Sequence, residues 1–258
     1  MAAPTIEIRQ ATAYDIIPIS QIHYRALERY HEFYAAFLAT HPRDILPKST
    51  ESALKTPDNI FLVAADSVTG KVVGFTRYYI VPEEKEKEED RRKALSSATP
   101  SAEATQAQSK PQVQVSSLYA SKSHVKDIWD RFSERDDEME AVYTGEVKGQ
   151  RHLYVKHLMI DPAHQRKGIG QRLLSAVLAK SDAEGIPTFL TASAESHALY
   201  EKLGFVDIGP AFRIDNEAWA REVLMRESVL GMEVNTKLEE QCRELSEVEN
   251  CMVRWVRT

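Results

Sequence analysis

The chain has 258 residues, of which 43% are hydrophobic, enough to bury the core of one large domain or two small ones. Its formal net charge of -6 gives no general attraction to nucleic acid or to an anionic membrane surface, so neither is an expected partner. The sequence has no long uncharged apolar run and no apolar leader, which predicts a soluble cytoplasmic protein, with the nucleus as the alternative location.

The cysteine content argues against a metal centre. Cys242 and Cys251 are the only two cysteines in the sequence, and they are far from any histidine-rich segment that could complete a ligand set. We therefore expect two reduced thiols, with a disulfide as the less favoured alternative, and no metal site. The oligomeric state does not follow from the sequence.

The first part of the chain predicts a strand, a helix and a hairpin. Residues 5–10 alternate apolar and polar side chains, and isoleucines then recur at helical spacing after Thr12 or Asp15, either of which can cap the helix. An aromatic stretch follows, for which core packing is favoured over a pocket lining: Tyr30, Phe33, Tyr34 and Phe37. Residues 59–66 and 71–79 are β-rich and are predicted to form adjacent antiparallel strands.

The composition changes abruptly near residue 83. A charged run gives way to a mixture of Ser, Ala, Gln and Pro with almost nothing to bury, and we predict a disordered insertion over residues 83–118. An amphipathic helix is expected next, because four large apolar side chains lie at i, i+3, i+4 and i+7: Val125, Ile128, Trp129 and Phe132.

The second part of the chain alternates strands and helices. We expect strands at 152–160, 187–191 and 205–212, and helices at 168–183, 196–203, 219–230 and 239–247. Residues 251–257 have a β-like pattern, and periodicity leaves open whether they join the main sheet. The predicted organisation is one domain over residues 6–232, interrupted by the insertion, and a C-terminal extension over residues 233–258.

The segment after the strand at 152–160 suits a phosphate ligand. Gly168 and Gly170 lack the Cβ atoms that would keep a ligand from the backbone, and they open a helix whose first N–H groups are unpaired. An anion placed there would also gain the positive end of the helix dipole. The Lys-Ser or Lys-Thr pair of a Walker loop and the third glycine of a dinucleotide fingerprint are absent. Taken alone, the two glycines are also compatible with an ordinary helix start.

Two motifs in this region resemble one family. The segment Gln165–Gly170 resembles the Gln/Arg-x-x-Gly-x-Gly/Ala acyl-CoA signature of the GNAT superfamily of N-acetyltransferases, and Leu158–Pro162 is similar to the strand end that precedes it. The segment Ala198–Phe205 is similar to the family's Leu-Tyr-x-Lys-Leu-Gly-Phe motif. The resemblance extends from about residue 6 to 232, and it is tight only between residues 153 and 205.

The resemblance implies a fold and a co-substrate. The fold would be α/β (α+β), with a mixed, mostly antiparallel central sheet flanked by helices and a V-shaped split between two strands that holds acyl-CoA. Acetyl-CoA would be the co-substrate, with no metal, and the main-chain N–H of Leu158 would stabilise the oxyanion. The implied cofactor-binding residues are Leu158, Met159, Ile160, Gln165, Arg166, Lys167, Gly168, Ile169, Gly170 and Ser193.

The same resemblance implies transfer of an acetyl group to the primary amine of a small molecule, by direct attack in a ternary complex. The alternatives are acetylation of a protein lysine or N-terminus, and a non-catalytic regulatory module that binds acyl-CoA. Tyr200 occupies the position of the family's proton donor to the leaving thiolate, and core packing is the alternative role for its ring.

No general base is evident from the sequence. Tyr154 and Lys156 match strand positions where the family often places one, and His157 is expected on the opposite face because strand side chains alternate. Three further residues could act through a water molecule: His152, Glu140 and Glu146.

Overall fold

The computed structural model describes residues 6–83, 117–233 and 235–256. Most of the predicted insertion, residues 84–116, lies outside the described residues. None of the helices in the described segments is both long and apolar enough to cross a membrane.

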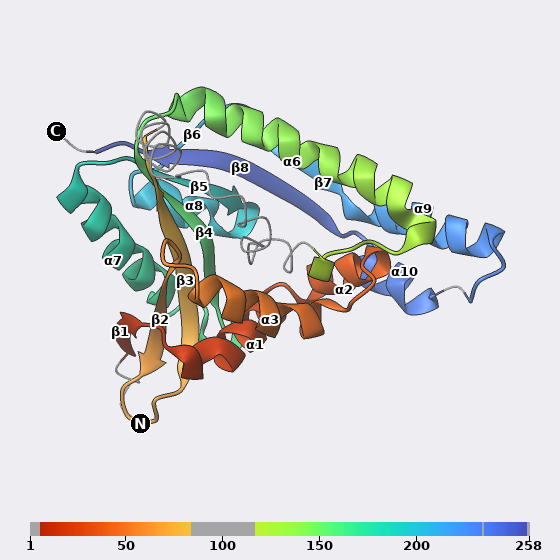
Figure 1. The fold of residues 1–258 in the computed structure, drawn as a ribbon, viewed down its shortest axis with the longest axis horizontal. Helices are drawn as coiled ribbons and strands as arrows, with labels where there is room; N and C mark the ends of the chain where they lie inside the picture. The colour runs from red at the N-terminus through yellow and green to blue at the C-terminus, as the bar shows by residue number, and fades with distance from the viewer. Residues whose placement is uncertain (1–5, 84–116, 234, 257–258) are drawn as a thin grey trace, which may run out of the picture.

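A mixed sheet of eight strands organises the described residues (Figure 1). The strand order is β1-β2-β3-β4-β5-β8-β6, and β7 also pairs with β8. Every pairing is antiparallel except that of β4 with β5, which confirms the predicted mostly antiparallel sheet. The strands are β1 (Ile6–Gln10), β2 (Ile60–Asp66), β3 (Val72–Val81), β4 (His152–Ile160), β5 (Thr188–Ser193), β6 (Val206–Asp207), β7 (Phe212–Asp215) and β8 (Ser246–Arg254).

The parallel pair β4 and β5 opens into a V. Residues 153–155 of β4 pair with residues 188–190 of β5, and the two strands are unpaired beyond Val155 and Leu190. On its other edge β4 stays paired with β3 as far as Ile160. The edge of β4 that faces the split therefore has backbone groups without strand partners over residues 156–160.

Helices cover both faces of the sheet (Figure 1). Ile19 and Ile22 of α1 pack on one face against Phe75 and its neighbours, whereas Leu173 of α7 packs on the other face against Val73. The described helices are α1 (Ile16–Ala26), α2 (Glu28–Phe37), α3 (Pro42–Leu54), α6 (Lys126–Val147), α7 (Ile169–Glu184), α8 (Ala194–Lys202), α9 (Asn216–Val229) and α10 (Thr236–Cys242).

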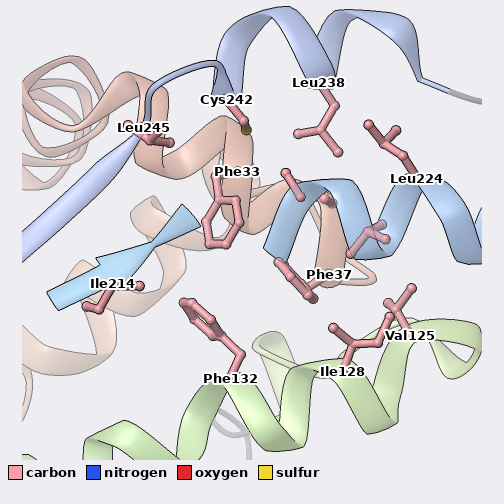
Figure 2. Packing of buried hydrophobic residues seen from close by; sticks show 13 residues of the cluster. Phe33, Phe37, Val125, Ile128, Phe132, Ile214, Leu224, Leu238, Cys242 and Leu245 are labelled. Carbon is pink, nitrogen blue, oxygen red and sulfur yellow. The ribbon is translucent and has the colours of Figure 1, made fainter. Parts of the chain in front are cut away.

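A second core joins α2, α6, α9 and α10 beside the sheet. Figure 2 shows Phe33 and Phe37 of α2 meeting Phe132 of α6, with Leu224 of α9 and Leu238 of α10 completing the cluster. The Phe37 and Phe132 rings are stacked, with centroids 5.6 Å apart. This cluster holds α6 in place. Because α6 runs along β8 (Figure 1), the helix forms a wall over this part of the sheet.

The C-terminal segment differs from its predicted form. The helix expected at 239–247 ends at Cys242, since Glu244 has a left-handed backbone with φ of 57°. Residues 246–254 form β8 instead, which lies between β5 and β6. The predicted C-terminal extension therefore supplies an internal strand of the sheet, which periodicity had left open. The strand expected at 205–212 is two short strands, β6 and β7, separated by Gly209 and Pro210.

Candidate active site

The turn that follows β4 is held by one buried carboxylate. Asp161 Oδ1 accepts a hydrogen bond from the Ala163 N–H at 3.0 Å, and Asp161 Oδ2 accepts one from Arg25 Nη2 of α1 at 2.6 Å. Burial alone would raise the pKa of Asp161, but the Ala163 hydrogen bond and the Arg25 charge lower it below its ordinary value. The carboxylate is therefore ionised, and it fixes the short 3-10 turn Pro162–His164 that leads to the glycines.

The two glycines have different roles. Gly168 is the N-cap of α7 with φ of 75°, a left-handed conformation that strains other residues. Gly170 lies in the first turn of α7, where a Cβ would meet Leu199 at 3.6 Å, an ordinary contact. Its missing side chain leaves space beside the free N–H groups of that turn. This local structure leaves room for a pyrophosphate, and the predicted pyrophosphate site stays a prediction.

A cleft of about 1480 Å³ brings most of the predicted site residues together. Ser193, at the end of β5, and Tyr200, in α8, line the same cleft as the glycine loop. Lys167 is the one predicted residue that does not line the cleft, because its ammonium donates a hydrogen bond to the Ala163 carbonyl at 2.9 Å. The predicted residues that do line it are Leu158, Met159, Ile160, Gln165, Arg166, Gly168, Ile169, Gly170, Ser193 and Tyr200.

The Tyr200 phenol is buried but reaches the cleft. Its side chain is 5% exposed, and its ring packs edge-on against Phe205 at a centroid distance of 5.8 Å. Burial raises the pKa of Tyr200, and this outweighs the opposite effect of a hydrogen bond with Ser196. The phenol is thus protonated at neutral pH and can donate a proton to a group in the cleft.

A β-bulge changes the expected orientation of His157. Arg77 of β3 pairs with His157, whereas the next residue, Tyr78, pairs with Val155, so Lys156 is an extra residue in β4. His157 consequently faces the same side of the sheet as Tyr154, and the prediction that it faces the opposite side was wrong. The His157 ring lies 4.7 Å from the His23 ring, and burial holds its pKa well below the ordinary value.

The remaining candidate bases differ in their burial and in whether they line the cleft. His152 is 1% exposed, and its two ring nitrogens hydrogen bond with the Tyr143 hydroxyl and the Gln150 carbonyl. Glu140 is exposed on α6 and lines the cleft, whereas Glu146, one turn or more further on, does not. Lys156 also lines the cleft, and burial lowers its pKa.

The half of the cleft below α6 is rich in phenols and carboxylates. Tyr79 and Tyr154 stack with centroids 5.5 Å apart, and Tyr143 of α6 meets Tyr154 edge-on at 5.2 Å. Tyr30 and Tyr34 of α2 extend this wall, which shows that the aromatic stretch serves both the core and the cleft. The carboxylates are Asp136 and Glu140 of α6, Glu195 of α8, and Glu247 and Glu249 of β8.

The two carboxylates of β8 were not predicted from the sequence, because its pattern favoured a helix that includes Glu247. The alternation of Glu247, Glu249 and Cys251 with other residues has the period of a strand, and this signal could have revealed a shared face. No group of His, Cys, Asp and Glu side chains within the described residues is arranged to hold a metal ion.

Residues 132–226 match the family model described as Acetyltransferase (GNAT) domain. Over residues 132–226 the chain is similar to a GNAT acetyltransferase domain. The matched segment runs from the middle of α6 into α9, so the acetyltransferase match includes β4, the glycine loop, α7, β5 and α8. No curated protein matches the chain.

Several solved structures are similar to the chain at low identity. A mosquito arylalkylamine N-acetyltransferase like 5b is 16% identical, with a TM-score of 0.49, over 97% of this chain and 99% of that chain. A histone acetyltransferase HPA2 and related acetyltransferase from Corynebacterium glutamicum is 16% identical, with a TM-score of 0.49, over 100% and 98%. Arabidopsis thaliana NAA60, in complex with a bisubstrate analogue, is 12% identical, with a TM-score of 0.48, over 98% and 99%. Sequence identities this low do not identify the acceptor substrate.

Proposed function

We propose that this GNAT domain transfers the acetyl group of acetyl-CoA to the primary amine of a small molecule, by direct attack in a ternary complex. The observation that carries the proposal is the shared cleft, in which the glycine loop and a half rich in carboxylates and tyrosines meet. One end suits a pyrophosphate, and the other suits an organic cation. Acetyl transfer between the two ligands requires that both bind in the same cleft.

The loop end supports acetyl-CoA as co-substrate. The free first-turn N–H groups of α7 would bind the pyrophosphate, and the unpaired edge of β4 would pair with the amides of the pantetheine arm, as a strand would. This arrangement would place the thioester carbonyl near the Leu158 N–H, which would stabilise the developing oxyanion. The phenol of Tyr200 would protonate the departing thiolate.

The α6 end supports an amine acceptor. Amines are mostly protonated at neutral pH, and tyrosine faces and carboxylates both attract ammonium groups. Five carboxylates line this half against two cations, Arg135 and Lys156. The wall of tyrosines favours an acceptor with an aromatic or apolar body, which would gain contact area there.

The test is thiol release from acetyl-CoA against a panel of 2-phenylethylamine, hexylamine, spermidine, a lysine peptide and a peptide with a free N-terminus. Release with the small amines, at higher kcat/KM than with either peptide, would support the proposal. Release with peptides alone would replace it with a protein acetyltransferase. Calorimetric binding of CoA without release from any acceptor would instead support a regulatory binding module.

A further inference from the structure

Glu249 lies where the two halves of the cleft meet. It is directly opposite Ser193 in the antiparallel pairing of β8 with β5. Residues opposite each other in such a pair have Cα atoms about 4.5–5.5 Å apart and side chains on the same face. Glu249 is therefore within one strand spacing of a residue assigned to acetyl-CoA binding, and α8 with Tyr200 begins at the residue after Ser193.

The strand register also places Glu249 at the level of the split. Val155 pairs with Leu190, and the same register continued along β4 past the bulge brings Leu158 level with the last residues of β5. The thioester carbonyl, which the proposed function places at Leu158, would then lie level with Ser193. Glu249 is the next side chain across the sheet from that point.

The side chain of Glu249 points toward the acceptor half. Side chains of β8 at residues 249, 251 and 253 share a face, since the period of a strand is two. On that face the Cys251 thiol contacts the Met139 carbonyl of α6 at 3.9 Å, and Val253 packs with Val147 of α6. Glu249 consequently faces α6 and the tyrosine wall, not α7.

The carboxylate of Glu249 has no direct partner among the residues that the structure describes. Its neighbour Glu247 accepts a hydrogen bond from Asn216 Nδ2 at 2.5 Å, whereas Glu249 makes no hydrogen bond or close ion pair with any residue of the described segments. A half-buried carboxylate without a partner is costly unless a cation approaches it. An acceptor ammonium is such a cation.

The charges around Glu249 tune its basicity. Burial raises its pKa above the ordinary value, and the negative charge of Asp136 acts in the same direction, whereas Arg135 and Lys156 oppose it. A carboxylate of raised pKa is a stronger base toward an ammonium group. The titratable and charged groups that face it from α2, α6, β4 and β8 are Tyr30, Tyr34, Arg135, Asp136, Tyr154, Lys156, Glu247 and Cys251.

The other titratable groups fit this role less well. Lys156 is adjacent, but in its charged form it repels the ammonium group that it would have to deprotonate. His157 also lines the cleft, but burial holds its pKa well below the ordinary value, which makes it a weaker base toward an ammonium group. Glu140 is exposed on α6, where water competes for a bound cation.

We propose that Glu249 binds the ammonium group of the acceptor and removes the proton that frees its lone pair. This assignment rests on the proposed function. One N–H proton passes to a carboxylate oxygen of Glu249, the lone pair forms the C–N bond, and the C–S bond breaks. The thiolate takes the hydroxyl proton of Tyr200. The second proton that the nitrogen loses then passes to the Tyr200 oxygen and restores the phenol. Glu249 then releases its proton to water, so one proton is released for each acetyl group transferred.

The test compares Glu249→Gln with Glu239→Gln, a control at an exposed position of α10. Glutamine keeps the shape of the side chain but neither attracts the cation nor accepts its proton. With 2-phenylethylamine and hexylamine, kcat/KM of E249Q at pH 7 should fall by about 10²–10³-fold. The difference in kcat/KM between E249Q and the native protein should become smaller toward pH 10, where the acceptor is increasingly a free amine. E239Q should match the native protein throughout.

A second readout is independent of turnover. Calorimetry of hexylammonium binding to the CoA-loaded protein should show at least about tenfold weaker binding by E249Q, with the affinity for CoA and the melting temperature unchanged. Unchanged hexylammonium binding, or kcat/KM of E249Q within about threefold of the native value at pH 7, would overturn the assignment. If the native protein binds CoA but acetylates no amine, the proposed function and the proton transfer to Glu249 both fail, and the hexylammonium measurement still decides whether Glu249 binds an ammonium group.

Discussion

Arg25 of α1 and Asp161 at the end of β4 form an ion pair with an N–O distance of 2.6 Å. The Arg25 side chain is about half exposed and that of Asp161 is almost fully buried, so the carboxylate depends on this contact and on the Ala163 N–H. The pair joins α1, which packs on the face of the sheet that carries Phe75, to the start of the glycine loop.

We expect Asp161→Asn to weaken both the fold and CoA binding. It removes the charge that Arg25 faces and disturbs the cap of the turn, which should lower the free energy of unfolding by about 1–3 kcal/mol. Urea unfolding and CoA calorimetry measure the two effects. Asp130→Asn, which breaks an exposed i,i+4 pair with Lys126, is the control and should change stability by less than about 0.5 kcal/mol. Equal effects of the two variants would contradict the role given to Asp161.

Gly170→Glu should abolish CoA binding without unfolding the protein. The site of its Cβ has only ordinary contacts, so the side chain can be accommodated, but its carboxylate would repel a pyrophosphate at the first turn of α7. Calorimetry with CoA gives the affinity. Gly170→Ala adds only the Cβ and should bind CoA within about tenfold of the native protein. Retained affinity in the Glu variant would move the pyrophosphate away from this loop.

Tyr200→Phe should slow turnover and leave substrate binding intact. A thiol with an ordinary pKa near 8.5 needs only modest help to leave, so we expect kcat to fall by about 10–100-fold with little change in KM. Steady-state kinetics with the best amine of the panel separate the two parameters. A variant with native kcat would show that the Tyr200 ring acts only in packing.

The stability of the fold should fall as the pH drops below about 6.5. Burial lowers the pKa of His23 to about 3 and that of His31 to about 4. In the unfolded chain, these histidines take up protons as the pH falls below their ordinary pKa of 6.5. In the folded protein, they do not take up protons until the pH approaches 4. Each group should therefore cost on the order of 2 kcal/mol of unfolding free energy between pH 8 and pH 5.

Urea unfolding at the two pH values, with His31→Phe as the comparison, tests this histidine effect. Phenylalanine keeps an aromatic ring beside Tyr24 and His23 but does not titrate. The drop in stability from pH 8 to pH 5 should be smaller in the variant than in the native protein. An identical drop in both proteins would exclude His31 as a source of the pH dependence.

The conformation of the glycine loop could be predicted from the sequence because its determinants are local. The conformation of Gly168 and the start of α7 depend on residues next to each other in the chain, and the bounds of β4 were predicted without error. The split between β4 and β5 followed from family resemblance, and the short parallel pairing confirms it.

The half of the cleft proposed to bind the acceptor could not be predicted, because it depends on contacts between distant segments. The insertion of Lys156 as a bulge becomes visible only when β3 pairs with β4, and this bulge decides where His157 points. The tyrosine wall combines residues of α2, β3, β4 and α6, and the sequence order gives no measure of their distances. Glu249 became interpretable only when β8 was seen beside β5.

The position of β8 has a consequence for the order in which the protein is made. On the ribosome, β4, α7, β5 and α8 are all synthesised before Ser246 emerges, so the elements of the acetyl-CoA end precede the strand that bears Glu249. Until β8 inserts, one edge of β5 stays open to pairing with other chains, and such an edge is an aggregation hazard for a nascent polypeptide. Late closure of the sheet by a strand distant in sequence also predicts slow final folding, since non-local pairing carries a large loop-closure cost.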